Sequence, residues 1–432
     1  MGLFAVNGLR VDGLRAEGLF AVGVLGFAFF GWLGAAGASI GLGLALISVA
    51  CRFPVMNIDN RDQLLFWLAA SYIFFILVRM MVAEPVDHLA SWLNAKYTLS
   101  LVLLWCFPLL ALGFQGRESL VRASLVLAGC GLMLQVLENT DFANLQEFFS
   151  QRQNFGMTFV GFGLFGALSF QFLLFGAATA VPALPSRRRR LVRGGLFVAG
   201  LVVFQALLMS QSRAGWVALA AAVLVVGVAT AMTKGRRGAF AARTTFAAVA
   251  VAGLVSILLL WFNMDRVVSK VQSEADVYAR TLSLDREEIP LTSFGRRAHM
   301  WLYAVDLIEE RPWLGWGIGA SPSLLSRDRD LKIHPHFHNS YVEILVEQGI
   351  IGLLFYAAVA GLLLTGLFRA YRQGRVPFAS WLVLLGGWTT ILVWSLANTR
   401  IVHADERFVL MLLGAITLSY AIGDDTGKSA DG

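Results

Sequence analysis

The chain has 432 residues, of which 57% are hydrophobic and only 15% are charged. A water-soluble core cannot bury so large an apolar fraction, so the composition excludes an ordinary soluble domain and indicates a protein that needs lipid as part of its solvent. The formal net charge of +7 does not indicate nucleic acid as a partner, because the basic residues form short clusters between apolar segments and no recognition motif is present.

The apolar segments predict the transmembrane helices. Crossing about 30 Å of hydrocarbon takes roughly 20 apolar residues in a helix. Such segments lie at residues 17–33, 35–51, 63–83, 96–113, 118–137, 155–180, 195–210, 214–232, 243–262, 340–369, 378–398 and 407–423. They predict an all-α membrane protein of about twelve transmembrane helices. The first two segments form one nearly unbroken run, which we expect to turn at Gly34 or Gly37, and without that turn the number falls to eleven.

The connections between these segments predict the orientation, because Lys and Arg accumulate in short loops on the cytoplasmic side. Alternate connections are basic, and they hold Arg52 and Arg61, Arg117 and Arg122, Arg187 to Arg190 with Arg193, Lys234 with Arg236 and Arg237, and Arg369 with Arg372 and Arg375. The connection with Glu138, Asp141 and Glu147 and the long segment 263–339 then face outward. We expect both termini in the cytoplasm.

Four regions follow from this reading. Residues 1–262 hold helices one to nine, and residues 263–339 form one large outer loop containing short helices. Residues 340–423 hold helices ten to twelve, and residues 424–432 form a disordered cytoplasmic tail. The loop contains ten basic and eleven acidic residues and is the only polar segment large enough to organise a site.

Residues 294–311 of this loop, FGRRAHMWLYAVDLIEER, have the periodicity of an amphipathic helix. One stripe carries Arg297, Trp301, Ala304 or Val305, and Ile308. Arg297 therefore faces the protein in the first turn, where its cation adds to free backbone N–H groups and suits an anion. A salt bridge between Arg297 and a neighbouring acid is the alternative.

Two further arginines lie at expected outward turns. Arg213, in SQSRAGW, follows a connection too short to expose it, and an ionisable group at that depth is costly unless it is paired or functional. A snorkelling or structurally paired arginine is the alternative for Arg213. Arg400, in the last outward connection, is a weaker candidate for the same kind of site.

Three histidines, His334, His336 and His338, lie where the loop enters the tenth helix. Their two-residue spacing allows a zinc site, since alternate residues of an extended strand share one face. Pro335 interrupts the run, however, and no Cys or nearby carboxylate completes the ligand set. A single histidine acting as a general base suits the pattern as well.

Several motifs together resemble the O-antigen ligase family. They are SRAGW at an outward helix start, the Arg-x-x-x-Trp helix at Arg297, RPWLGWGIG, and HNSYVEILVEQGIIG, and the resemblance spans roughly residues 205–369. It implies a twelve-helix fold without a metal or other cofactor. It also implies the transfer of O-antigen polysaccharide from undecaprenyl diphosphate to lipid A-core, among membrane lipids, on the periplasmic face of the bacterial inner membrane.

The resemblance carries over to few positions. It implies that Arg213 and Arg297 bind the diphosphate and that His338 is the catalytic histidine. Arg296 is a possible substitute for Arg297, because the doubled arginine leaves the register open. His334 and His336 belong to no motif of the family that we can place, and His336 remains a possible site residue.

The residue types agree with this chemistry. Breaking a sugar–diphosphate bond releases a weak base, so cations that hold its charge suffice and no general acid is needed. A histidine base would activate the acceptor hydroxyl in one inverting displacement. A retaining route would need a carboxylate nucleophile, for which Glu343 and Glu347 are the nearest candidates.

Alternatives to a ligase remain at this stage. An O-antigen polymerase or a protein O-oligosaccharyltransferase of the same superfamily would use the same donor and differ in the acceptor. A membrane transporter belongs to a different class, but the sequence has no convincing internal repeat, and its placeable polar groups gather at one face.

Overall fold

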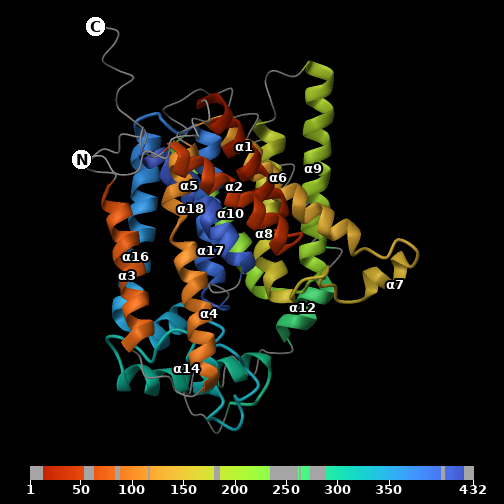
Figure 1. Ribbon diagram of the computed structural model, residues 1–432. Coiled ribbons are helices and arrows are strands. Elements are labelled where there is room, and N and C mark those ends of the chain that lie inside the picture. Colours follow the sequence, from red (N-terminus) through yellow and green to blue (C-terminus); the bar gives the residue numbers. More distant parts are fainter. Residues whose placement is uncertain are drawn as a thin grey trace, which may run out of the picture.

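The computed structural model describes residues 13–52, 63–82, 88–114, 117–179, 185–233, 261, 264–272, 289–399 and 404–422. Within these ranges the helices are α1 (Gly13–Phe30), α2 (Ala35–Arg52), α3 (Gln63–Val82), α4 (His88–Leu104), α5 (Phe107–Phe114), α6 (Glu118–Glu138), α7 (Leu145–Ser150), α8 (Phe159–Thr179), α9 (Ser186–Met209), α10 (Arg213–Thr233), α12 (Met264–Gln272), α14 (Ser293–Glu310), α15 (Ser321–Leu325), α16 (Ser340–Arg372), α17 (Phe378–Trp394) and α18 (Ala404–Ala421). These residues contain no strand, so the expected all-α class is confirmed for the described part of the chain (Figure 1).

Several of these helices can cross a membrane. In the described residues, six are long and apolar enough: Ala95–Phe114, which joins most of α4 to α5, and α6, α8, α9, α10 and α16. Shorter apolar helices lie in α1, α2, α3 and α17. The ninth predicted segment, 243–262, lies outside the described residues except for Trp261, so a total of twelve spans stays a prediction.

The first apolar run turns where the sequence predicted. α1 ends at Phe30, and α2 begins at Ala35 after a turn that includes Gly34, whereas Gly37 lies inside α2. The two helices form a hairpin whose contact is made possible by glycine, since a β-carbon at Gly41 would lie 2.4 Å from the backbone N of Phe27. The first two predicted segments are therefore separate helices.

The arginine run 187–190 differs from its predicted role as a connection. α9 begins at Ser186 and continues to Met209, so the run and Arg193 form its first turns, and most of these arginines are exposed. Arginine is a good helix former, so the run can continue the helix. Pro185 is the N-cap, and the fixed backbone of proline suits a position at the start of a helix. The predicted start at residue 195 was therefore too late by more than two turns.

α8 lies at the centre of the bundle. Its residues from Gly161 to Phe170 are all buried, as expected of a helix that is apolar on every side. It packs against α6, α9, α10 and α17. Glycines allow the closest of these approaches: a β-carbon at Gly215 of α10 would lie 2.5 Å from the backbone O of Gly163 in α8.

The helices give the bundle two distinct ends. At one end, here called the loop end, α8 and α10 begin, α9 and α17 end, and α14 crosses below the bundle (Figure 1). At the other end, α6, α9 and α17 begin and α16 and α18 end. The arginine run of α9 and the arginines at the end of α16 thus lie opposite the loop end.

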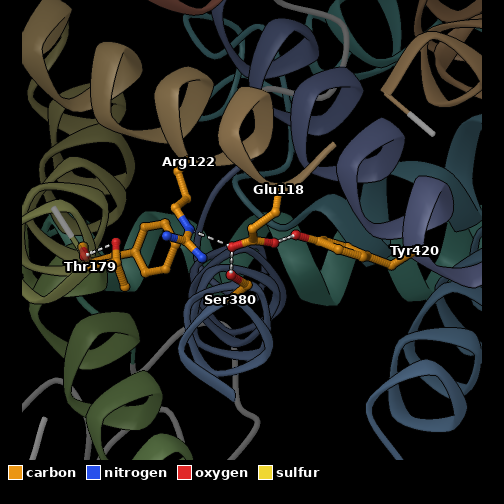
Figure 2. Close-up of polar contacts among 6 residues, drawn as sticks. Glu118, Arg122, Thr179, Ser380 and Tyr420 are labelled. Atoms are coloured by element: carbon orange, nitrogen blue, oxygen red, sulfur yellow. Dashed lines mark hydrogen bonds and ion pairs between the residues drawn. The ribbon is translucent and has the colours of Figure 1, made fainter. Parts of the chain in front are cut away.

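A partly buried acid joins three helices at this opposite end. Glu118, in the first turn of α6, accepts hydrogen bonds from Arg122 Nε at 2.7 Å and from Ser380 Oγ in the first turn of α17. The hydroxyl of Tyr420, near the end of α18, donates to the second carboxylate oxygen. Figure 2 shows all three donors around this one carboxylate. We call Glu118, Arg122, Ser380 and Tyr420 the Glu118 cluster.

Replacing Glu118 by alanine should destabilise the helix bundle, because three donors would lose their acceptor at once. Hydrogen bonds to a charged group typically contribute about 1.5–3 kcal/mol. We expect the purified variant to aggregate at a clearly lower temperature than wild type in a thermal scan. Glu138, an exposed acid at the other end of α6, provides the matched control. An equal effect of Glu138→Ala and Glu118→Ala would contradict the role of the cluster.

Candidate active site

The predicted amphipathic helix is confirmed as α14. Its N-cap is Thr292, whose side chain accepts a hydrogen bond from the backbone N of Gly295 at 3.2 Å. Ala304 is buried and Val305 is half exposed, so Ala304 is the residue that continues the inward stripe from Trp301. Trp301 Nε1 donates to the backbone O of Phe337 at 2.9 Å. α14 therefore packs directly against the segment that carries the histidines.

The loop after α14 is built onto the backbone of α16. Gly349 interrupts the helical geometry of α16 with a φ of 68°. At this break, Trp316 N donates to the O of Val346 at 2.8 Å, and Ile350 N donates to the O of Pro312 at 2.8 Å. The glycine-rich GWGIGA segment thus forms a tight turn against a helix.

Two buried carboxylates of α16 hold this loop in place. Glu347 Oε1 accepts from Ser321 Oγ at 2.9 Å and from Ser321 N at 3.3 Å. Glu343 Oε2 accepts from the backbone N of Phe337 at 2.8 Å. Both side chains are less than a tenth exposed. The sequence marked them as possible nucleophiles, whereas here they bind the loop backbone and Ser321.

His338 is held in a strained conformation between fixed neighbours. Its φ of 54° lies in the left-handed region, which a residue other than glycine adopts at a cost and only where its surroundings enforce it. Before it, Phe337 is bound through both its N and its O. After it, Asn339 caps α16 through Tyr341 N at 3.0 Å, and Ser340 N donates to Ser395 O at 2.9 Å in the turn after α17. The position of the ring is thereby well defined.

The three histidines form one cluster with the arginines of α14. The ring centroids of His336 and His338 lie 4.2 Å apart, and those of His334 and His338 lie 5.7 Å apart. Burial and the charges of His336, Arg297 and His334 lower the pKa of His338 to about 2. Burial, Arg296 and Arg297 likewise lower the pKa of His334. His338 is thus neutral at physiological pH, and its buried Nδ1 has no hydrogen-bond partner among the described residues.

The zinc alternative gains no support from this arrangement. Across the described ranges, no group of three or more His, Cys, Asp or Glu side chains is placed to hold a metal ion. The structure therefore brings together Arg297 and His338 as the sequence predicted, with Arg296 close enough to act on His334. Arg400 lies outside the described residues.

Arg213 also lies at the loop end, as the first residue of α10. The preceding turn is braced, because Ser210 Oγ and Trp216 Nε1 both donate to the O of Leu207, at 2.7 and 3.1 Å. α17 packs along α10 and ends in the turn that binds Ser340. Arg213, at the start of α10, and His338, just before α16, therefore lie at the same end of the bundle, where α17 packs against both helices.

Arg152 is a polar residue of this end that the sequence did not single out. It lies between α7 and α8, in the connection noted only for its acids. Its Nε donates to the O of Ser210 at 2.8 Å, and its guanidinium lies 3.8 Å from the ring centroid of Phe159. Partial burial and the neighbouring charge of Arg213 lower its pKa. One basic residue in an acidic loop was the signal that could have revealed it.

A family model matches the part of the chain that holds this site. Residues 198–357 match the family model described as O-antigen ligase. The matched segment runs from α9 into α16 and includes Arg213, Arg296, Arg297, the three histidines and both buried glutamates. None of the curated proteins matches the chain.

Proposed function

We propose that the chain, whose residues 198–357 match the O-antigen ligase family model, transfers O-antigen polysaccharide from undecaprenyl diphosphate to lipid A-core. The carrying observation is the neutral His338 beside Arg297, a proton acceptor and a permanent cation in one cluster. We place this reaction on the periplasmic face of the inner membrane. The arginines of α9 and α16 at the opposite end support that orientation, because they would then lie in the cytoplasm.

The proposed reaction is a single displacement. The acceptor hydroxyl oxygen attacks the anomeric carbon of the first donor sugar, and a ring nitrogen of His338 takes the hydroxyl proton. The bond from that carbon to the diphosphate oxygen breaks, and undecaprenyl diphosphate leaves with the electron pair. Arg213 and Arg297 bind the diphosphate and stabilise the charge that develops on it.

The surroundings of the glutamates support inversion over retention. A retaining enzyme would need a free carboxylate beside the anomeric carbon. Glu343 and Glu347 are buried, and each already accepts hydrogen bonds from the loop. Linkage analysis of the product from a donor of known anomeric configuration tests this step. Retained configuration would reject the single displacement.

A transfer assay with purified lipid-linked donor and lipid A-core, in excess chelator, tests the proposed function. We expect the wild-type chain to be active and the Arg213→Ala and Arg297→Ala variants to be about 10- to 100-fold less active, because each loses a charged contact to the leaving group. Loss of wild-type activity with chelator would support the alternative of a metal site. Absence of transfer without chelator would contradict a ligase.

Deletion of the gene distinguishes a ligase from a polymerase of the same superfamily. A ligase deletion should leave lipid A-core without O-antigen while lipid-linked polymer of normal length persists. A polymerase deletion would instead leave a single repeat attached to lipid A-core. Uptake without transfer in vesicles would support the transporter class.

A further inference from the structure

Arg152 lies on a loop whose path is fixed on several sides. Phe155, with a φ of 51°, turns the chain back and packs its buried ring against Phe162, with centroids 4.7 Å apart. Gln135 Nε2 from α6 donates to the O of Phe155 at 3.0 Å, and the N of Gln153 donates to Met209 O at the end of α9 at 3.2 Å. The backbone at Arg152 is therefore tied to α6, α8 and α9.

The guanidinium of Arg152 is fixed but not enclosed. Its Nε is occupied by Ser210 O, and one face lies over the ring of Phe159. These contacts leave the two terminal amino groups available, and the residue as a whole is exposed. A planar guanidinium held in this way is suited to bind a phosphate or carboxylate through two parallel hydrogen bonds.

Arg152 and Arg213 place two positive charges side by side. The charge of Arg213 acts on Arg152, and among the described residues no acid forms an ion pair with Arg152. The terminal amino groups of Arg152 therefore lie close to a second positive charge, an arrangement that suits a ligand with two negative charges. The first turn of α10, which begins at Arg213, adds free backbone N–H groups and the positive end of the helix dipole.

We propose that Arg152 and Arg213 together form a binding site for the diphosphate of the lipid-linked donor and of the polyprenyl diphosphate that it leaves. This inference rests on the proposed function, and it adds Arg152 as a residue that binds the leaving group. The braced turn at Ser210 carries both arginines, Arg213 through the chain and Arg152 through the hydrogen bond to Ser210 O. The same turn therefore holds the Arg152 side chain and the backbone of Arg213 before the donor arrives.

Direct binding of farnesyl diphosphate to the purified full-length chain in nanodiscs tests the proposal. We expect Arg152→Ala to weaken binding about 10- to 100-fold, because one charge-assisted contact is lost. Farnesyl monophosphate and farnesol serve as comparison ligands. Arg329, an exposed arginine of the loop after α15, provides the matched control, and Arg329→Ala should bind like wild type.

The variant Arg152→Gln separates charge from bracing, since glutamine can still donate to Ser210 O but is neutral. A binding role predicts that Arg152→Gln loses the preference for diphosphate over monophosphate. A purely structural role predicts an unchanged preference with a lowered melting temperature, and this result would overturn the proposal. So would a wild-type chain that does not bind farnesyl diphosphate.

The His338→Ala variant keeps this test independent of the proposed function. It should bind farnesyl diphosphate normally while being inactive in transfer. If wild type binds farnesyl diphosphate through Arg152 but transfers no polysaccharide to lipid A-core, the diphosphate site is supported and the ligase activity is rejected. Should transfer proceed while Arg152→Ala and Arg152→Gln bind like wild type, only the role of Arg152 would be rejected.

Discussion

Replacing His338 by alanine is expected to reduce kcat of polysaccharide transfer by about 10²- to 10⁴-fold, the usual contribution of a positioned general base. Donor binding should be nearly unchanged, because the diphosphate is bound by arginines. The measurement is steady-state transfer from purified donor to lipid A-core. The control is Lys332→Ala, which replaces an exposed side chain of the same loop and should retain wild-type kcat. A His338→Ala enzyme with more than a tenth of wild-type kcat would exclude His338 as the base.

The pH dependence of the wild-type enzyme should reflect the lowered pKa of His338. In the free enzyme the pKa of His338 is lowered to about 2 by burial and by neighbouring groups that include Arg297. A base with a lowered pKa stays unprotonated as the pH falls, so kcat/KM should not decline around pH 6.5, where an ordinary histidine protonates.

Donor binding should shift this behaviour. The negative charge of the diphosphate offsets Arg297 and removes part of the cause that lowers the pKa of His338. The pKa should therefore rise in the complex, and the decline of kcat on the acidic side should occur at a higher pH than that of kcat/KM. Parallel profiles for both constants between about pH 5 and 8 would contradict this coupling.

Gly315→Ala is the second substitution for which we expect a large loss of activity. Gly315 has a φ of 62°, and a β-carbon there would lie 2.5 Å from the backbone C of Glu347. The neighbouring atoms belong to the backbone and cannot rotate away, so the loop must move off α16. Because the same helix carries Glu343 and the cap after His338, we expect kcat to fall about 10²-fold, as a misplacement of about 1 Å can cause.

Gly361→Ala is the matched control for this substitution. Gly361 lies in α16 as well, but a β-carbon there meets nothing within 4 Å. This variant should keep wild-type kcat and should resist protease like wild type, whereas Gly315→Ala should be cut more readily in the loop. Full activity of Gly315→Ala would show that docking of this loop on α16 does not position His338.

Much of the helix arrangement could be predicted from the sequence because lipid imposes one simple requirement, a long apolar run for every crossing. The turn at Gly34 and the long helix from Ser340 followed from this rule. The break between α4 and α5 at Trp105 did not, because both sides of the break are apolar and periodicity carries no signal there. The start of α9 was misplaced for a related reason, since charged residues do not end a helix that leaves the membrane.

The candidate site was predictable only in part. Arg297 and His338 each follow from local patterns and from the family motifs, and the structure brings them together. The contacts of Glu347 with Ser321 and of Arg152 with Ser210 join residues far apart in the chain. No local pattern encodes such pairs, because they depend on how separate helices pack. The sequence pattern therefore could not show that Glu343 and Glu347 bind the loop.

The break of α16 at Gly349 has a consequence for how the loop tolerates changes in length. The backbone groups that the break releases from the helix are bound by the backbone of Pro312, Trp313, Trp316 and Gly317. An insertion in 312–317 would leave the buried backbone groups of residues 346–349 without partners, at a cost of several kcal/mol each. The mostly exposed stretch from Ser326 to Asp330 forms none of the described backbone hydrogen bonds to α16. Extra residues should therefore be tolerated there but not in 312–317.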